Sequence, residues 1–117
     1  MISISAEVAA KFLGITIGIA EGECSKNSIT DEQAYLAETR EAEKKARQIP
    51  VLAENPSIAA WRKMYRAFGE DPTKRKPSAE ALAKRVSNGE SLPRVNGIVD
   101  CYNLVSLRNL LPIGGHD

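Results

Sequence analysis

The residues best suited to chemistry in this chain gather at its C-terminal end. Gly114 and Gly115 form a pair that lets backbone amides approach a ligand closely. They are followed by His116, the only histidine, and by Asp117. In that order the histidine could act as a general base and the carboxylate could orient it. A simple turn explains the same residues, so the pattern by itself leaves a catalytic role open.

A strongly apolar stretch, residues 98–111, precedes this turn. It is expected to be a central helix because it is apolar around most of its circumference. Asn103, Ser106 and Asn109 interrupt it on one side, at intervals of three residues. Buried polar groups are normally hydrogen-bonded. This side therefore either lines a pocket for a polar ligand or bonds to neighbouring backbone.

The middle of the chain is basic. Residues 61–94 hold nine Lys or Arg against four Asp or Glu, although the net charge of the whole chain is only +1. Such a cluster could follow a phosphate backbone, and an ordinary solvated surface between helices explains it as well. The candidate RNA-binding residues are Arg62, Lys63, Arg66, Lys74, Arg75, Lys76, Arg85 and Arg94.

Several classes of protein are disfavoured by the sequence. Cys24 and Cys101 lack C-x-x-C spacing, and with His116 and Asp117 they show no metal-ligand spacing. We expect no metal, no other cofactor and no covalent nucleophile. The apolar run at residues 12–20 is too short to cross a bilayer, and no basic leader precedes it. These features predict a cytoplasmic protein without a membrane partner.

Start and stop signals predict about five helices. They are expected over residues 5–12, 30–47, 55–69, 78–88 and 98–111. The proposed N-caps are Ser5, Thr30, Asn55 and Ser78, and Gln33 is expected to complete a capping box with Thr30.

Residues 13–20, Leu-Gly-Ile-Thr-Ile-Gly-Ile-Ala, are short and rich in β-branched side chains, which predicts a buried strand. A single strand cannot satisfy its own backbone hydrogen bonds. We therefore expect a mixed α+β fold with a small sheet, whose other strands lie near residues 1–5, in the loops or beyond residue 117. On this view residues 1–117 are one domain, the N-terminal portion of a larger domain that is incomplete at its C-terminus.

Residues 61–69, 77–82 and 112–117, with Asn103 between them, form an ordered set of short motifs. Together they resemble stand-alone members of the B-three/four domain family. That family is the editing module of the bacterial phenylalanyl-tRNA synthetase beta subunit and also occurs as a free-standing protein. The resemblance covers residues 55–117 well and the N-terminal half only in outline.

The resemblance implies an α/β unit with a pocket that hydrolyses tyrosine misattached to phenylalanine tRNA. Asn103, Pro112 and Asp117 fall on the matching Asn, Pro and Asp of the family pattern. Gly114 falls on the family histidine, and His116 takes the place of a Phe. The candidate catalytic residues are His116 and Asp117, and the candidate substrate-binding residues are Asn103, Ser106, Pro112, Gly114 and Gly115.

Three functions remain open at this point. The first is a trans-editing hydrolase or tRNA-binding module, with a tRNA and a small amino acid as ligands. The second is a non-catalytic protein that binds an amino acid or RNA. The third is a structural fragment that becomes stable by pairing with another chain, including a second copy in a homo-oligomer.

Overall fold

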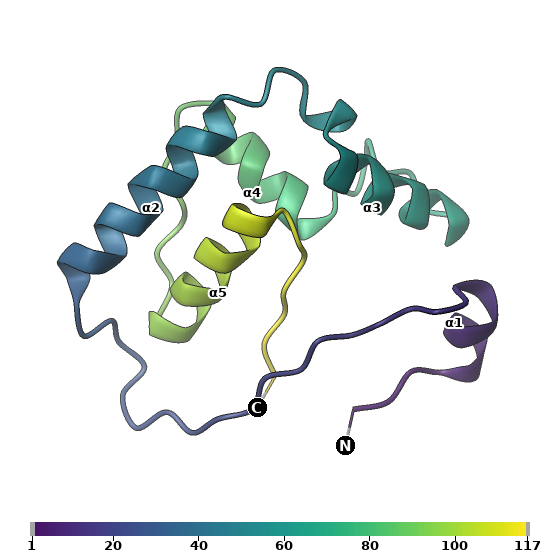
Figure 1. Cartoon of the computed structure of the whole chain (residues 1–117), viewed down its shortest axis with the longest axis horizontal. Coiled ribbons are helices and arrows are strands. Elements are labelled where there is room, and N and C mark those ends of the chain that lie inside the picture. The colour runs from purple at the N-terminus through teal and green to yellow at the C-terminus, as the bar shows by residue number, and fades with distance from the viewer. Residues whose placement is uncertain (1, 117) are drawn as a thin grey trace.

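The computed structural model describes residues 2–116 as helices joined by long extended segments (Figure 1). In chain order these are α1 (Ala6–Lys11), α2 (Glu32–Arg47), the 3-10 turn η1 (Leu52–Glu54), α3 (Pro56–Ala67), α4 (Ser78–Ser87) and α5 (Gly97–Asn109). The five predicted helices are confirmed, with ends that differ by a few residues.

Side chains at the helix starts explain where two of these helices begin. The Ser5 hydroxyl accepts a hydrogen bond from the Val8 amide at 3.3 Å, as predicted for the cap of α1. Asn55 accepts from the Ser57 amide at 3.0 Å, with Pro56 as the first residue of α3. Each side chain satisfies a backbone donor that has no partner inside its helix.

Two predicted caps are wrong. Asp31 rather than Thr30 caps α2, because its Oδ1 accepts from the Ala34 amide at 3.0 Å. The expected capping box of Thr30 and Gln33 therefore does not form. Ser78 is the first residue inside α4, which has no side-chain cap. Thr30 and Asp31 are adjacent residues of capping type, and the sequence did not decide between them.

No strand occurs among residues 2–116, so the predicted α+β class and small sheet are wrong for the described structure, which is all-helical. Leu13 and Gly14 form a turn, with Gly14 at φ +78°, and residues 15–24 then run without regular structure. Residues 16–26 form no backbone–backbone hydrogen bond with other described residues. β-branched side chains favour extended backbone, but a strand also needs a neighbouring strand to pair with.

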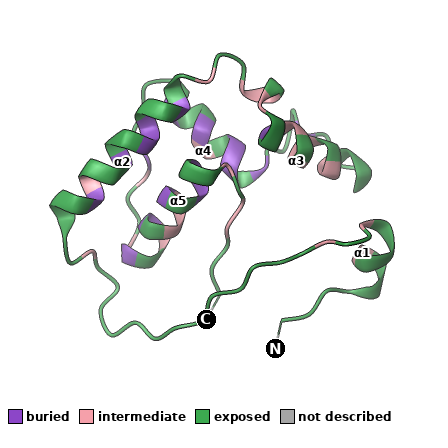
Figure 2. Cartoon of the chain, viewed as in Figure 1, coloured by how far each residue is buried: buried purple, intermediate pink, exposed green. Residues whose placement is uncertain are grey.

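Helices α2, α4 and α5 pack around one small core (Figure 2). Helix α5 is central on one face only, since Leu104 and Leu107 are buried whereas Ile98 and Val105 are exposed. The buried members of the core are Tyr35, Ala42, Ala46, Ala83, Val86, Leu92, Leu104 and Leu107.

The loop before α2 is fixed to the start of α5. The Gly97 amide donates to the Asn27 carbonyl at 3.1 Å, and the Ile98 amide donates to Asn27 Oδ1 at 2.7 Å. A Cβ atom on Gly97 would lie 2.7 Å from the Ser28 backbone nitrogen. Only glycine allows this approach without movement of the backbone.

A buried carboxylate joins α2 to the connector between α4 and α5. Glu43 is 5% exposed, and its Oε2 accepts a hydrogen bond from the Leu92 amide at 2.9 Å. Arg47, one turn later, donates from Nε to the Val86 carbonyl at 3.1 Å. These two side chains hold the end of α4 and the following residues against α2.

We predict that Glu43→Ala lowers the free energy of unfolding by about 2 kcal/mol, because it leaves the buried Leu92 amide without its charged acceptor. Glu41→Ala on the exposed face of the same helix is the matched control and should change stability by less than about 0.5 kcal/mol. Urea unfolding followed by circular dichroism measures both. Equal effects of the two substitutions would contradict the role given to Glu43.

Candidate functional site

The predicted glycine turn leaves α5 through a residue in the left-handed conformation, Leu110, at φ 50°. The buried Ser106 hydroxyl donates to the Leu111 carbonyl at 2.7 Å, and the Leu111 amide donates to the Ser106 carbonyl at 3.2 Å. Ser106 therefore holds the end of the helix. Its hydroxyl hydrogen is used inside the chain rather than offered to a ligand.

Beyond this point the chain passes over the ring of Tyr102. A Cβ atom on Gly115 would lie 3.0 Å from Tyr102 Cε2, so a glycine lets the backbone contact the ring. Pro112 is half-buried, whereas Gly114 and Gly115 are exposed. The glycine pair thus permits a close approach, but to a side chain of the same molecule.

The two predicted catalytic residues are His116 and Asp117. His116 is exposed, and Asp117 lies outside the described residues. Asn103 is half-buried on α5, and its side chain forms no hydrogen bond with another described residue. The cavity between residues 49–53 and α4 and the smaller one between α2 and the end of α5 are not lined by Asn103, Ser106 or residues 112–116.

Arg94, one of the predicted RNA-binding residues, is engaged within the fold. It donates to Asp100 Oδ2 at 2.8 Å and to Glu32 Oε2 at 3.2 Å. Its guanidinium also lies 4.6 Å from the centre of the Tyr35 ring. The hydrogen bond from Arg94 lowers the pKa of Glu32, and the two carboxylates raise the pKa of Arg94. Arg94 therefore joins α2 to α5.

Three more of the predicted basic residues have partners. Arg85 donates to the Ser91 carbonyl at 2.8 Å, and Arg62 pairs with Glu80. Arg75 lies 3.6 Å from Glu70 in a solvent-exposed pair, which contributes little to stability. The remaining candidates are exposed and have no carboxylate partner among the described residues: Lys63, Arg66, Lys74 and Lys76.

An aspartate turn shapes the connector between α3 and α4. Asp71 Oδ1 accepts from the Thr73 amide at 2.9 Å and from the Thr73 hydroxyl at 2.6 Å. These bonds lower the pKa of Asp71, and the charges of Arg66 and Arg62 lower it further. The charges of both arginines of α3 therefore act on the Asp71 carboxylate. The connector that carries residues 74–76 starts beside that helix.

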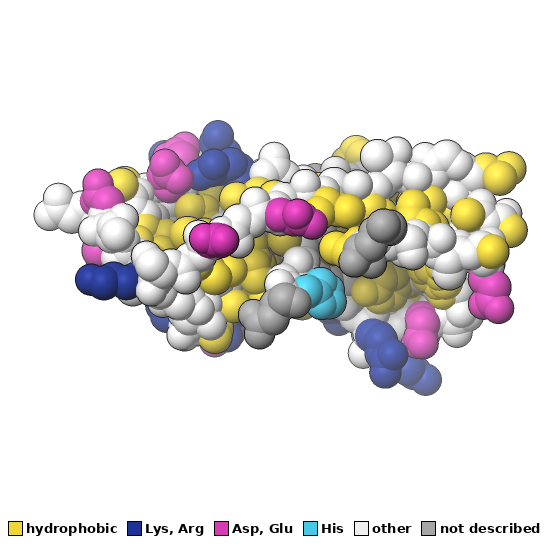
Figure 3. Space-filling model, turned by 90° about the horizontal axis from the view of Figure 1, so that it is seen from below, with side chains coloured by type: hydrophobic (Ala, Val, Ile, Leu, Met, Phe, Trp, Pro, Cys, Tyr) yellow, Lys and Arg dark blue, Asp and Glu magenta, His cyan; other side chains and the backbone are white. Residues whose placement is uncertain are grey.

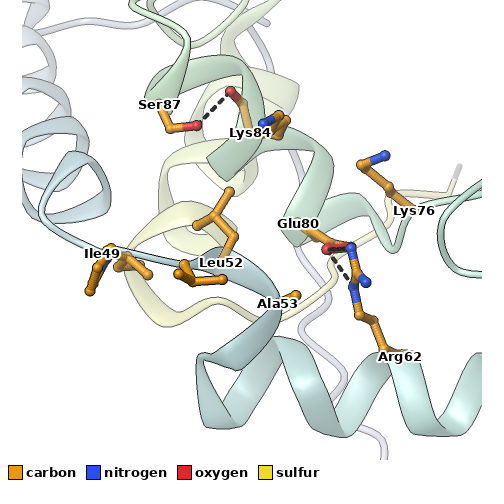
Figure 4. Close-up of a pocket in the computed structure, with 10 residues that line it drawn as sticks. Ile49, Leu52, Ala53, Arg62, Lys76, Glu80, Lys84 and Ser87 are labelled. Carbon is orange, nitrogen blue, oxygen red and sulfur yellow. Dashed lines mark hydrogen bonds and ion pairs between the residues drawn. The ribbon is translucent and has the colours of Figure 1, made fainter.

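A cavity of about 440 Å³ opens between the segment before α3 and the side of α4 (Figure 4). Its apolar wall is the backbone and side chains of residues 49–53. The opposite wall is polar and mostly basic, formed by Arg62, Lys76, Glu80, Lys84 and Ser87.

An ion pair forms one side of this cavity. Glu80 is 2% exposed, and its Oε1 accepts from Arg62 Nε at 2.7 Å. Figure 4 shows Arg62 reaching from α3 to Glu80 on α4, across from Leu52 and Ile49. The pair thus fixes α3 to α4 beside the cavity. Because one carboxylate is set among three cations, this wall carries a net positive charge.

Glu80 and residues 49–53 were not predicted as site residues. A signal for Glu80 was present, since it lies between Ala79 and Ala83 on the apolar side of its helix. A carboxylate in that position is buried only when it is paired. Residues 49–53 carried no comparable signal, because their role depends on where α3 and α4 meet.

Comparison with known protein families matches residues 60–117 to the B3/4 domain, the family that the sequence resembles. Residues 60–117 belong to the B3/4 domain family. The match is to part of that domain, and it contains α4, α5, most of α3 and the glycine turn. The apolar wall of the cavity lies before the matched B3/4 residues. No curated protein and no solved structure matches the chain.

Two further properties concern residues 2–116. No helix in this range combines the length and hydrophobicity that a membrane crossing requires. No group of three or more His, Cys, Asp or Glu side chains in this range is placed to hold a metal ion.

The bond between Arg94 and Glu32 predicts a pH dependence of stability. The pKa of Glu32 is lowered in the folded protein, so its contribution is present above its ordinary pKa and is lost as the pH falls through the folded value. Wild-type protein should therefore be more stable than Glu32→Gln at pH 7, and the difference should shrink as the pH falls below the ordinary pKa of a glutamate. Urea titrations at a series of pH values measure this difference.

The matched control is Glu41→Gln, which removes an exposed carboxylate on the same helix that has no ion-pair partner among the described residues. It should show little difference from wild type at any of these pH values. A difference for Glu32→Gln that stays constant down to low pH would contradict an electrostatic role for this carboxylate.

Proposed function

We propose that this chain is a B3/4 module that binds the aminoacylated 3′ end of a tRNA. The observation that carries the proposal is the family match of residues 60–117. The B3/4 domain resembles the unit that edits charged tRNA in the phenylalanyl-tRNA synthetase beta subunit. A tRNA ligand implies a cytoplasmic protein.

The exposed cations of the match region support an RNA ligand. Lys63 and Arg66 lie on α3, and Lys74 and Lys76 lie on the connector that starts beside it. None of the four is tied to a carboxylate among the described residues. Cations of this kind bind phosphates and release counterions, which gives affinity without sequence preference.

The cavity between residues 49–53 and α4 is the proposed receptor for the end of the acceptor strand. Its apolar wall suits an unstacked base or an amino-acid side chain. Lys76 and Lys84 line the same cavity and suit the adjoining phosphate. The ligand would thus bridge the cavity and the basic surface of α3.

Hydrolysis of the aminoacyl ester is the second candidate function, because the matched residues include the glycine turn. That reaction needs a positioned water and a group that accepts its proton. The proposed catalytic residues are His116 and Asp117, with substrate binding by Asn103, Ser106, Pro112, Gly114 and Gly115. Binding is preferred over hydrolysis because Ser106 is already bonded to Leu111.

Replacing two connector lysines, Lys74→Gln with Lys76→Gln, should weaken tRNA binding at low salt. The plot of log affinity against log salt concentration should become shallower by about 1 to 2 units of slope, since two phosphate contacts are removed. Fluorescence anisotropy with labelled tRNA measures both quantities. The matched control is Arg40→Gln with Lys44→Gln, which removes the same charge from exposed positions on α2. Equal losses in the two double variants would contradict a binding surface at the connector.

On the second candidate function, which places the aminoacyl group beside α5 and the glycine turn rather than in the cavity, Asn103→Ala should weaken binding of an aminoacyl-adenosine analogue by about tenfold or more. The unfolding midpoint should change little, because Asn103 is half-buried and bonds to no described residue. Titration calorimetry and thermal unfolding measure the two effects. A fall in stability with unchanged affinity would make Asn103 a structural residue.

A tRNA deacylation assay separates the two functions. Binding without release of amino acid from mischarged tRNA is the expected result. Release that is lost in His116→Ala would favour hydrolysis. If the protein showed no binding and no release, the proposal would be contradicted.

A further inference from the structure

Residues 15–20, Ile-Thr-Ile-Gly-Ile-Ala, alternate strictly between large and small side chains. In extended backbone Ile15, Ile17 and Ile19 face one side, with the small residues on the other. Ile17 is 49% exposed and Ile19 is 53% exposed. Residues 16–26 form no backbone–backbone hydrogen bond with other described residues. The segment therefore has the side-chain pattern of a strand and, from Thr16 onward, the unpaired backbone of a strand edge; the Ile15 amide donates to the Phe12 carbonyl at 3.2 Å.

The accessible surface of the molecule is also larger than that of a compact monomer of the same mass. Its accessible surface is 8418 Å², whereas a compact monomer of 12.7 kDa exposes about 6200 Å². The radius of gyration, 15.5 Å, likewise exceeds the value of about 13.4 Å for a compact chain of this length. The excess surface is about 2200 Å² per chain. If two chains covered each other's excess, they would bury about 4400 Å², which is typical of an obligate dimer.

Much of this extra surface is apolar. Figure 3 shows hydrophobic side chains spread over the underside of the molecule, with few charges between them. Other exposed apolar side chains are Phe68 at the end of α3, Ile98 and Val105 on α5, and Leu111 after it. A helix that is apolar around most of its circumference is normally buried on all sides, so α5 lacks a cover over Ile98 and Val105.

We propose that a second copy of this chain covers the exposed apolar surface, with residues 15–19 of the two copies paired as antiparallel strands about Ile17. In this register Ile17 faces the partner's Ile17, and Ile15 faces the partner's Ile19. All the isoleucines then lie on one face of the ribbon, and Thr16 lies opposite the partner's Gly18. The arrangement is two-fold symmetric, so each copy supplies the same surface.

The charges that flank the segment favour this direction of pairing. Lys11 precedes the segment, and Glu21 and Glu23 follow it. Antiparallel pairing brings the basic end of one copy toward the acidic end of the other, whereas parallel pairing would set like charges together. No charged residue lies within residues 12–20. Because a two-stranded ribbon is only marginally stable in water, the ribbon sets the register and the apolar side chains supply most of the stability.

Sedimentation equilibrium of the full chain tests the assembly. We expect a dimer whose dissociation constant rises at least tenfold in Ile17→Lys, which places a charge in the paired face. The matched control is Thr16→Lys, which adds the same charge to the opposite face and should leave the dimer in place. Circular dichroism should show unchanged helix content in both variants, since residues 16–26 form no backbone hydrogen bonds with the helices.

Cysteine cross-linking tests the register independently of affinity. In a chain with Cys24→Ser and Cys101→Ser, Ile17→Cys should form a disulfide-linked dimer under mild oxidation. Facing Cβ atoms in such a ribbon are about 5 Å apart. The two residues 16 of such a ribbon are diagonal neighbours about 7 to 8 Å apart, so Thr16→Cys should not cross-link.

Three results would overturn the proposal: a monomer at all concentrations, a dimer unaffected by Ile17→Lys, or equal cross-linking by both cysteine variants. A chain that stays monomeric but binds a foreign sheet edge through residues 15–19 would also overturn it, in favour of a different partner. None of these measurements involves tRNA, so they succeed or fail independently of the proposed function.

Discussion

Close packing of α2, α4 and α5 through alanine-sized side chains holds the rest of this structure in place. Ala42 and Ala46 on α2 and Ala83 on α4 are almost completely buried in one cluster. Small side chains let helix axes approach to the short end of the usual range, so a few larger residues such as Leu104 and Leu107 fill the space that remains. The connector between α4 and α5 is then tied to this unit by two charged side chains of α2, Glu43 and Glu32. A core of this size cannot also cover α1, the extended N-terminal segment and the outer face of α5.

The helices could be predicted because their signals are local. A cap such as Ser5 or Asn55 acts on a backbone group two or three residues away, so both partners are visible in a short window of sequence. The sheet could not be predicted in the same way. Residues 13–20 have the composition of a strand, but pairing depends on a second segment, and residues 2–116 supply none. Strand pairing is a contact between residues far apart in the sequence, and the composition of one segment does not predict it.

At the candidate site, too, local features could be predicted and contacts between distant residues could not. The basic character of residues 61–94 was visible as a count of charges, and five of the eight candidates are exposed without a carboxylate partner in the described chain. The engagement of Arg94 within the fold could not be predicted, because Glu32, which binds it, is 62 residues away. Ser106 was correctly expected to be hydrogen-bonded, and the sequence left open whether its partner was a ligand or the backbone. The cavity was not foreseen at all, since it exists only where residues 49–53 meet α4.

Helix α3 links the cavity to the exposed apolar surface. It buries only one residue fully, Ile58, so its position depends on its packing against η1 and on two side-chain contacts. One is the Arg62–Glu80 pair beside the cavity, and loss of the arginine would strand a buried carboxylate at a cost of about 3 to 5 kcal/mol. The other is the packing of Phe12 on Phe68, with ring centres 4.7 Å apart, which joins the end of α3 to the N-terminal segment. Any partner that fixes the N-terminal segment therefore also restrains α3, and with it the basic residues and the polar wall of the cavity.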